Sequence, residues 1–151
     1  MARAQYQVLV IPYYMENDSV QYCIFERRDM GIWQFIAGGG EDEDASILAS
    51  AQREAFEEAG IDKENRFDRL QTQCSIPAFC FKGATSWGDD CFVIPEYAFA
   101  VRVNERKIER SDEHTAYKWV NYEEALRRLH YDSNKTALWE LDARIKRRLL
   151  H

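Results

Sequence analysis

Three glutamates within five residues constrain this chain more than any other feature of its sequence. The run reads Arg53-Glu54-Ala55-Phe56-Glu57-Glu58-Ala59-Gly60-Ile61. The segment 46–59 is predicted to be a helix, because alanine, leucine and glutamate favour helices, with Ser46 as the N-cap and Gly60 after the last turn. On a helix, Glu54 lies three and four residues from Glu57 and Glu58, so the three carboxylates share one face.

Carboxylates that share a helix face suggest a bound cation. Like charges at this spacing destabilise an isolated helix by roughly 0.2–0.5 kcal/mol per pair, and a bound cation would reverse that effect. Ligands that are all oxygen suit hard ions, so the sequence predicts Mg²⁺, with Mn²⁺ as the alternative. Taken alone, the same residues also fit a solvated acidic face on which Arg53 is the i,i+4 partner of Glu57.

Three consecutive glycines, Gly38 to Gly40, lie just before this helix. Glycine lets the backbone take positive φ angles and lets it approach a ligand closely. A carbonyl at Gly39 is therefore predicted to add a ligand to a metal held by the helix, and Gly38 to lie against the substrate. Either feature alone is weak evidence, whereas the glycine run and the acidic face together favour a metal site.

Gly39 and the run 53–61 together resemble the Nudix box, G-x5-E-x7-R-E-U-x-E-E-x-G-U, where U is aliphatic or similar. Two positions depart from the pattern: Ala45 stands where the first glutamate belongs, and Ala55 is small for its position. Residues 41–44 are all acidic. One of them could replace the missing carboxylate, or all four could form a solvated loop. The resemblance implies that Ala45 alters affinity and does not abolish activity.

The resemblance implies a fold, a reaction and roles for the box residues. The fold is of the α/β (α+β) class, with a mixed β-sheet sandwiched between helices. The reaction is hydrolysis of a phosphoanhydride with a divalent metal ion. By this resemblance, Glu54 and Glu58 are the principal metal ligands and Glu57 completes the set. Arg53 orients a carboxylate within the cluster.

Three further segments resemble the dihydroneopterin triphosphate pyrophosphatases within that family. They are Trp33-Gln34, residues 113–119 and Ser133-Asn134-Lys135. In the first segment Trp33 is a candidate to stack on a base or pterin ring, and Gln34 is a candidate to form a hydrogen bond with the substrate. Asn134 and Lys135 are candidates to contact ring or phosphate groups. The alternatives are a core position for Trp33 and helix capping for Asn134.

The general base is assigned only by resemblance. Family members use either a glutamate of the box or one from a distal loop. Glu113 is the distal candidate, because it matches the glutamate of the related E-H-x-A-Y-K-W segment. The alternative is an exposed acid before a strand. The adjacent His114 is a second candidate, for which a surface or packed position is the simpler interpretation.

The remaining pattern predicts strands before and after the box helix. Runs of β-branched and aromatic residues indicate strands over 6–11, 20–25, 67–76, 92–103 and 116–120. The polar residues 16–19 predict a hairpin between the first two, and Pro95 is expected at an edge or a bulge. A capping box at Asn121 begins a short helix to about Leu129.

A last helix is predicted after Asp132 or Ser133, which would cap it. Its apolar face is expected to contain Leu138, Leu141, Ile145 and Leu149. With 151 residues, the chain fits one domain, which we expect to span 1–151. Oligomeric state is not decided by the sequence, although a homodimer fits the family.

Composition excludes several classes of function. The net charge of −6 disfavours sequence-independent nucleic-acid binding, which depends on Lys and Arg against phosphates. No apolar run is long enough to span a membrane, and the first residues lack the pattern of a signal peptide, so we expect a cytoplasmic protein. The four cysteines include no C-x-x-C pair and are expected to be free thiols in or near the core.

Three functions compete at this stage. The first is Mg²⁺-dependent hydrolysis of a nucleoside or dihydroneopterin triphosphate, a small-molecule substrate, to monophosphate and pyrophosphate. The second is hydrolysis of a compound linked through a nucleoside diphosphate, such as ADP-ribose, a sugar nucleotide or a dinucleoside polyphosphate. The third is a non-catalytic nucleotide sensor, which only Ala45 favours.

Overall fold

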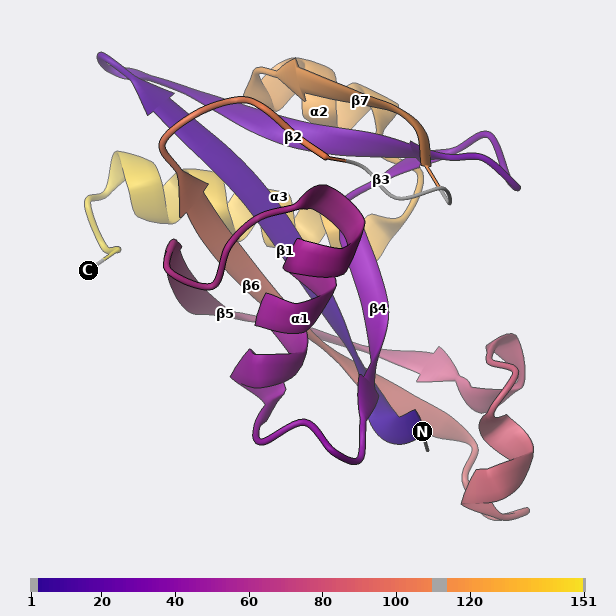
Figure 1. Cartoon of the computed structure of the whole chain (residues 1–151). Helices are drawn as coiled ribbons and strands as arrows, with labels where there is room; N and C mark the ends of the chain where they lie inside the picture. Colours follow the sequence, from indigo (N-terminus) through magenta and orange to yellow (C-terminus); the bar gives the residue numbers. More distant parts are fainter. Residues whose placement is uncertain (1–2, 110–113, 151) are drawn as a thin grey trace.

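A mixed β-sheet forms the centre of the computed structural model, which describes residues 3–109 and 114–150 (Figure 1). Its strands are β1 (Arg3–Glu16), β2 (Ser19–Arg27), β3 (Trp33–Gln34), β4 (Ile36–Glu41), β5 (Arg66–Pro77), β6 (Val93–Val103) and β7 (His114–Val120). Five are ordered β3-β2-β1-β6-β5, while β4 pairs with β1 and β7 with β2. β1 and β6 run parallel, and the other pairs are antiparallel.

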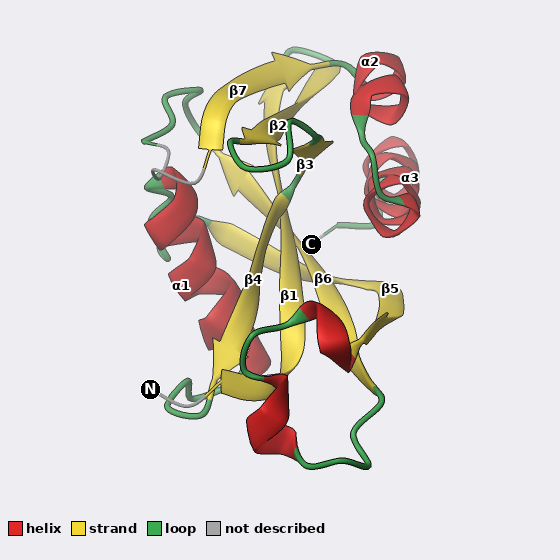
Figure 2. Cartoon of the chain, turned by 90° about the vertical axis from the view of Figure 1, so that its right-hand side faces the viewer, coloured by secondary structure: helices red, strands yellow, loops and turns green. Residues whose placement is uncertain are grey.

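Helices cover both faces of the sheet. They are α1 (Ile47–Ala59), α2 (Tyr122–Arg128) and α3 (Asp132–Lys146), with the short 3₁₀ helices η1 (Ala78–Cys80) and η2 (Ala84–Trp87). Figure 2 shows α1 on one side of the strands and α2 and α3 on the other. The predicted α/β (α+β) sandwich is therefore confirmed. None of the helices in the described ranges combines the length and apolar composition that a membrane span requires.

The centre of β1 is apolar on both sides because both faces of the sheet are covered. Val8 and Val10 belong to the core cluster beneath α1. Leu9 and Ile11 alternate with them and belong to the cluster beneath α2 and α3. β1 turns into β2 through the predicted hairpin, in which Asn17 takes a φ of 56°, a conformation that asparagine tolerates.

Helix α1 begins and ends as its sequence predicts. The Ser46 side chain accepts a hydrogen bond from the Ala49 backbone N–H at 3.0 Å, and Gly60 takes a φ of 68° after the last turn. The fully buried Ala55 is one of the small residues that let the helix lie against the sheet. Leu48, in the first turn, is 41% exposed.

The glycine run forms part of a strand and does not use the positive φ angles that glycine permits. Gly38 to Gly40 lie in β4, paired with β1, and none of the three has a positive φ. Their lack of side chains serves a different purpose. A Cβ atom on Gly38 would overlap the Glu54 carboxyl group, and one on Gly39 would overlap the Arg3 guanidinium. The glycines thus allow a close approach of these side chains, while the predicted approach to a ligand stays a prediction.

Smaller differences concern the ends of elements. Tyr131 occupies the N-cap position of α3 without a side-chain hydrogen bond, and Asp132 is already the first helical residue. Leu149 lies beyond the helix and is half exposed. Pro95 pairs with Ser75, while the ladder to β1 begins one residue later, so the proline occupies a position with a single neighbouring strand, as its missing N–H requires. All four cysteines are free thiols.

Candidate functional site

Arg53 is the centre of the site. Its Nη1 donates to Glu54 Oε2 at 2.7 Å and more weakly to the two carboxylate oxygens of Glu57 at 3.3 and 3.4 Å. Its Nη2 donates to the Gly39 carbonyl at 2.8 Å. One guanidinium thus ties the acidic face of α1 to the glycine strand β4.

Asp44 anchors the other side of that guanidinium. Its two oxygens accept from Arg53 Nε at 3.1 Å and Nη2 at 3.0 Å, the bidentate geometry in which arginine binds carboxylates most specifically. Ser50 Oγ also donates to Asp44 at 2.6 Å. The hydrogen bond from Arg53 is the largest cause that lowers the pKa of Asp44 to about 2. Ala45 therefore does not leave Arg53 without an acidic partner, because the preceding residue supplies one.

Glu54 is the buried carboxylate of the cluster. It is 8% exposed, on the helix face that meets Gly38. Burial raises the pKa of Glu54 to about 7, although the ion pair with Arg53 opposes that rise. The negative charges of Glu57 and Glu58 add to it. A carboxylate desolvated beside like charges gains strongly from a cation.

The donor set fits a hard cation in composition. Glu41 Oε2 lies 3.7 Å from Arg53 Nη1, so with Asp44, Glu54 and Glu57 four carboxylates surround this one guanidinium. The Glu57 side chain is 52% exposed and can turn toward an ion, and the Gly39 carbonyl keeps a second lone pair. No three acidic, histidine or cysteine side chains of the described residues already converge as a metal site. Binding an ion would therefore need side-chain rearrangement around Arg53.

The residues predicted to contact the substrate's ring lie together on another part of the molecule. Asn134 Oδ1 accepts from the Phe35 backbone N–H at 2.8 Å, which ties α3 to the segment just after Gln34. Gln34 and Asn134 are both buried, at 4% and 3% exposed. Trp33 pairs with Glu26 of β2 and is half-buried, and Lys135 lies in the first turn of α3.

The side chains of the two candidate bases from the distal segment, Glu113 and His114, lie outside what the structure describes. Glu113 lies outside the described residues. His114 opens β7, where its backbone pairs with Arg27 of β2. Within the described part of the site, Glu54 is the carboxylate whose pKa is raised to near neutrality, the range that suits a general base.

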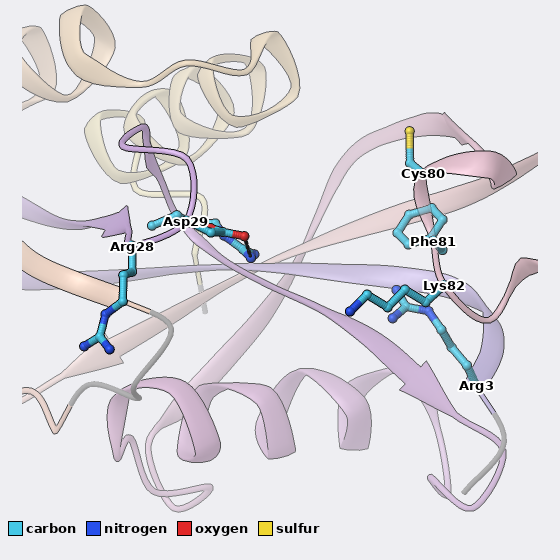
Figure 3. Close-up of a pocket in the computed structure, with 7 residues that line it drawn as sticks. Arg3, Arg28, Asp29, Cys80, Phe81 and Lys82 are labelled. Atoms are coloured by element: carbon cyan, nitrogen blue, oxygen red, sulfur yellow. Dashed lines mark hydrogen bonds and ion pairs between the residues drawn. The ribbon is translucent and has the colours of Figure 1, made fainter.

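A basic cavity of about 550 Å³ opens beside the glycine strand (Figure 3). Its lining includes Arg3 from β1, Arg27, Arg28 and Asp29 from the end of β2, and Phe81 and Lys82 from the segment after η1. Figure 3 shows Arg28 on one side of the opening and Arg3 with Lys82 on the other. None of Trp33, Gln34, Asn134 and Lys135 belongs to the lining.

No pattern in the sequence predicts this cavity. Its cations are separated by up to 79 positions (Arg3 to Lys82) and follow no motif. Only the Arg27-Arg28 pair at the end of a predicted strand offered a signal. Trp87 donates from Nε1 to the Arg3 carbonyl at 2.9 Å and so helps to hold one wall of the cavity.

Comparisons with known proteins agree on the family. The NUDIX domain model matches residues 6–140. Nudix hydrolase 13, mitochondrial, of Arabidopsis thaliana is 32% identical over 109 residues, which are 68% of this chain and 50% of that protein. This chain therefore spans about half the length of that curated relative.

Solved structures agree as well. A Nudix hydrolase structure from Listeria monocytogenes is 39% identical, superposes with a TM-score of 0.86, and the match covers 96% of this chain and 97% of that one. The E. coli dihydroneopterin triphosphate pyrophosphohydrolase superposes with a TM-score of 0.74 at 23% identity, over 94% of this chain and 99% of that one, which shows a shared fold. Enzymes of this family generally require divalent metal ions. With a family match over most of its length and the sandwich fold around the box helix, this chain belongs to the Nudix family of hydrolases.

Proposed function

We propose that this chain is a Mg²⁺-dependent pyrophosphohydrolase that converts a nucleoside or dihydroneopterin triphosphate to the monophosphate and pyrophosphate. The observation that carries the proposal is the carboxylate cluster of α1, held by Arg53 against the glycine run of β4. Glycine residues there let the Glu54 carboxyl group lie directly against the strand.

Each box residue has a proposed role. Glu54, Glu57 and Glu58 hold the cation, with the Gly39 carbonyl as a further oxygen ligand. A cation bound there offsets phosphate charge and lowers the pKa of a bound water. Arg53 is a positioning residue, since it binds Asp44 on one side and fixes Glu54 on the other.

The reaction needs one water and one base. The water oxygen forms a bond to phosphorus, the bridging P–O bond breaks, and pyrophosphate leaves with the electron pair of that bond. A carboxylate accepts the water's proton. By the resemblance, that carboxylate is either a glutamate of the box or Glu113. At the substrate's other end, Trp33 is proposed to stack on the ring.

Gln34, Asn134 and Lys135 are proposed to complete the substrate contacts, and Gly38 to contact the substrate through its backbone. The Asn134 side chain already accepts a hydrogen bond from the Phe35 backbone N–H. This bond supports a role for Asn134 in positioning the neighbouring Gln34, as well as a direct contact with the substrate. Gln34 pairs with Phe25 of β2, so its backbone position is fixed by the sheet.

Charge-neutral variants of the box test the proposal. Glu57→Gln and Glu58→Gln should each lower kcat by about 100-fold or more with Mg²⁺ and a triphosphate, since each removes one negative ligand. Glu64→Gln is the matched control, because Glu64 is exposed and follows the helix. Turnover that survives both box substitutions would refute the assignment of these carboxylates.

Product analysis separates this function from hydrolysis of diphosphate-linked compounds. A triphosphate cleaved as proposed releases pyrophosphate, whereas ADP-ribose releases two monophosphates. The sensor alternative is disfavoured by Asp44, which gives Arg53 a carboxylate partner where the family pattern is interrupted at Ala45. Metal-dependent binding of triphosphates without any turnover would overturn the proposed function.

A further inference from the structure

The basic cavity beside β4 has the charge of an anion site. Four cationic side chains, those of Arg3, Arg27, Arg28 and Lys82, line it with a single carboxylate, that of Asp29. The whole chain carries a net charge of −6, so the cavity is a region of excess positive charge in a chain that is negatively charged overall. Such a concentration of positive charge in a concave site attracts polyvalent anions.

Two of these cations are available to a ligand. Arg27 already binds Asp29 through two hydrogen bonds, each 3.0 Å long. Arg28 and Lys82 are exposed, and neither forms an ion pair with another residue in the ranges that the structure describes. They face the opening from opposite sides, one from the end of β2 and the other from the segment after η1 (Figure 3).

Arg3 connects this cavity to the carboxylate cluster. Its guanidinium occupies the space that a Cβ on Gly39 would need, while the carbonyl of the same glycine accepts from Arg53. The charge of Glu54 acts on Arg3 across this strand. Arg3 Nε is buried and has no hydrogen-bond partner among the described residues, an unmet donor that a ligand oxygen or a bridging water would satisfy.

The cavity is unlike a site for a sugar or a stacked ring. A sugar needs several acceptors and donors for its hydroxyl groups, but the one carboxylate in the lining is already held by Arg27. The Phe81 ring is covered by the Arg3 guanidinium, 4.6 Å from its centroid, and Trp87 packs beside it at 6.1 Å. Phosphate oxygens are the ligand chemistry that matches the lining.

We propose that this cavity binds the part of a phosphate chain that extends beyond the scissile bond, and so restricts the substrates to compounds with at least three contiguous phosphates. The inference rests on the proposed function, in which the carboxylates of α1 hold the phosphates being separated. A diphosphate occupies only that cluster. A third phosphate reaches past Gly39 to Arg3, Arg28 and Lys82.

Binding without metal tests this directly. Isothermal titration in EDTA would compare inorganic tripolyphosphate with pyrophosphate on the wild-type chain and on the double variant Arg28→Ala/Lys82→Ala. The wild type should bind tripolyphosphate at least about tenfold more tightly than pyrophosphate. The double variant should lose about tenfold or more in tripolyphosphate affinity, as expected for the loss of a charge-assisted contact.

A matched control removes the same charge elsewhere. Lys63→Ala/Arg147→Ala also deletes two exposed cations, neither of which lines the cavity, and should leave tripolyphosphate affinity within about twofold of the wild type. Thermal unfolding of both double variants checks that they are folded. Equal losses in the two double variants, or equal wild-type affinities for the two phosphate compounds, would overturn the inference.

The outcome separates this inference from the proposed function. Cavity-dependent binding of tripolyphosphate by a chain that hydrolyses no triphosphate would support the inference and overturn the proposed function. Mg²⁺-dependent hydrolysis of triphosphates with an unchanged KM in Arg28→Ala/Lys82→Ala would overturn the inference alone.

Discussion

Glu54 should make the metal-free protein less stable as the pH rises. Its pKa is raised from 4.5 to about 7 in the folded chain, chiefly because the carboxylate is buried. Below pH 4.5 the group is protonated in both the folded and the unfolded state. Between these two pKa values the folded state holds more protons than the unfolded state, so the free energy of unfolding falls as the pH rises.

The size of this effect follows from the same shift. A rise from 4.5 to about 7 corresponds to roughly 3 kcal/mol between the two ends of the window. In a domain of this length, that is a difference in Tm of about 6–12 °C. Glu54→Gln removes the titration but keeps an oxygen that can accept from Arg53. The variant should therefore gain stability relative to the wild type between pH 5 and pH 8.

Urea unfolding in EDTA at pH 5, 6, 7 and 8 measures this directly. The difference between Glu54→Gln and the wild type should grow by about 2–3 kcal/mol across the series. Glu64→Gln is the control, because it removes one exposed carboxylate that lies outside the cluster. Adding Mg²⁺ at pH 8 should stabilise the wild type and not Glu54→Gln. A difference in the free energy of unfolding that stays constant, or that shrinks as the pH rises, would show that burial does not raise the pKa of Glu54.

Three other substitutions test the anchor of Arg53, the close approach at Gly38 and the N-cap of α1. Asp44→Asn should lower kcat by about 10–100-fold through loss of the anchor of Arg53, and a normal kcat would contradict that role. It should also remove a stabilising contribution that the wild type keeps above pH 4 and loses as the pH falls toward 2, measured by acid unfolding. Gly38→Ala should displace the Glu54 carboxyl group and weaken Mg²⁺ binding in calorimetry; unchanged affinity would show that the close approach is unimportant. Ser46→Ala should cost about 1 kcal/mol in thermal unfolding, and no loss would mean that the cap is not needed.

The helix at the centre of the site could be predicted because its signals are local. Ser46 and Gly60 mark its two ends, and the spacing of the glutamates places them on one face regardless of the rest of the chain. The sandwich fold followed from the resemblance to the Nudix box. Local signals of this kind depend on backbone preferences and on the period of the helix, both of which a single sequence contains.

The place of Gly38 to Gly40 in a strand could not be predicted, because the contacts that require glycine there come from the tertiary structure. Glycines in sequence favour turns, but here three neighbouring side chains fill the space that their own side chains would take: those of Glu54, Arg3 and Tyr6. These neighbours lie at distant positions of the chain. In the same way, four acidic residues precede the helix, and only the folded geometry selects Asp44 as the partner of Arg53.

The basic cavity is the clearest case of a site that topology assembles. β1, the end of β2 and the segment after η1 each contribute cations that no spacing rule connects. The parallel pairing of β1 with β6, and the hydrogen bond from Trp87 to the Arg3 carbonyl, bring the last of these segments beside the first.

The most direct test of the central claim is a hydrolysis screen of the wild-type chain, with Mg²⁺ and with EDTA, that quantifies monophosphate and pyrophosphate together. The compounds would be dihydroneopterin triphosphate, the common nucleoside triphosphates, ADP-ribose and diadenosine polyphosphates. We predict that a triphosphate yields equal amounts of monophosphate and pyrophosphate, that this requires Mg²⁺, and that Glu58→Gln yields neither product. Turnover of ADP-ribose in preference to every triphosphate, or turnover that continues in EDTA, would contradict it.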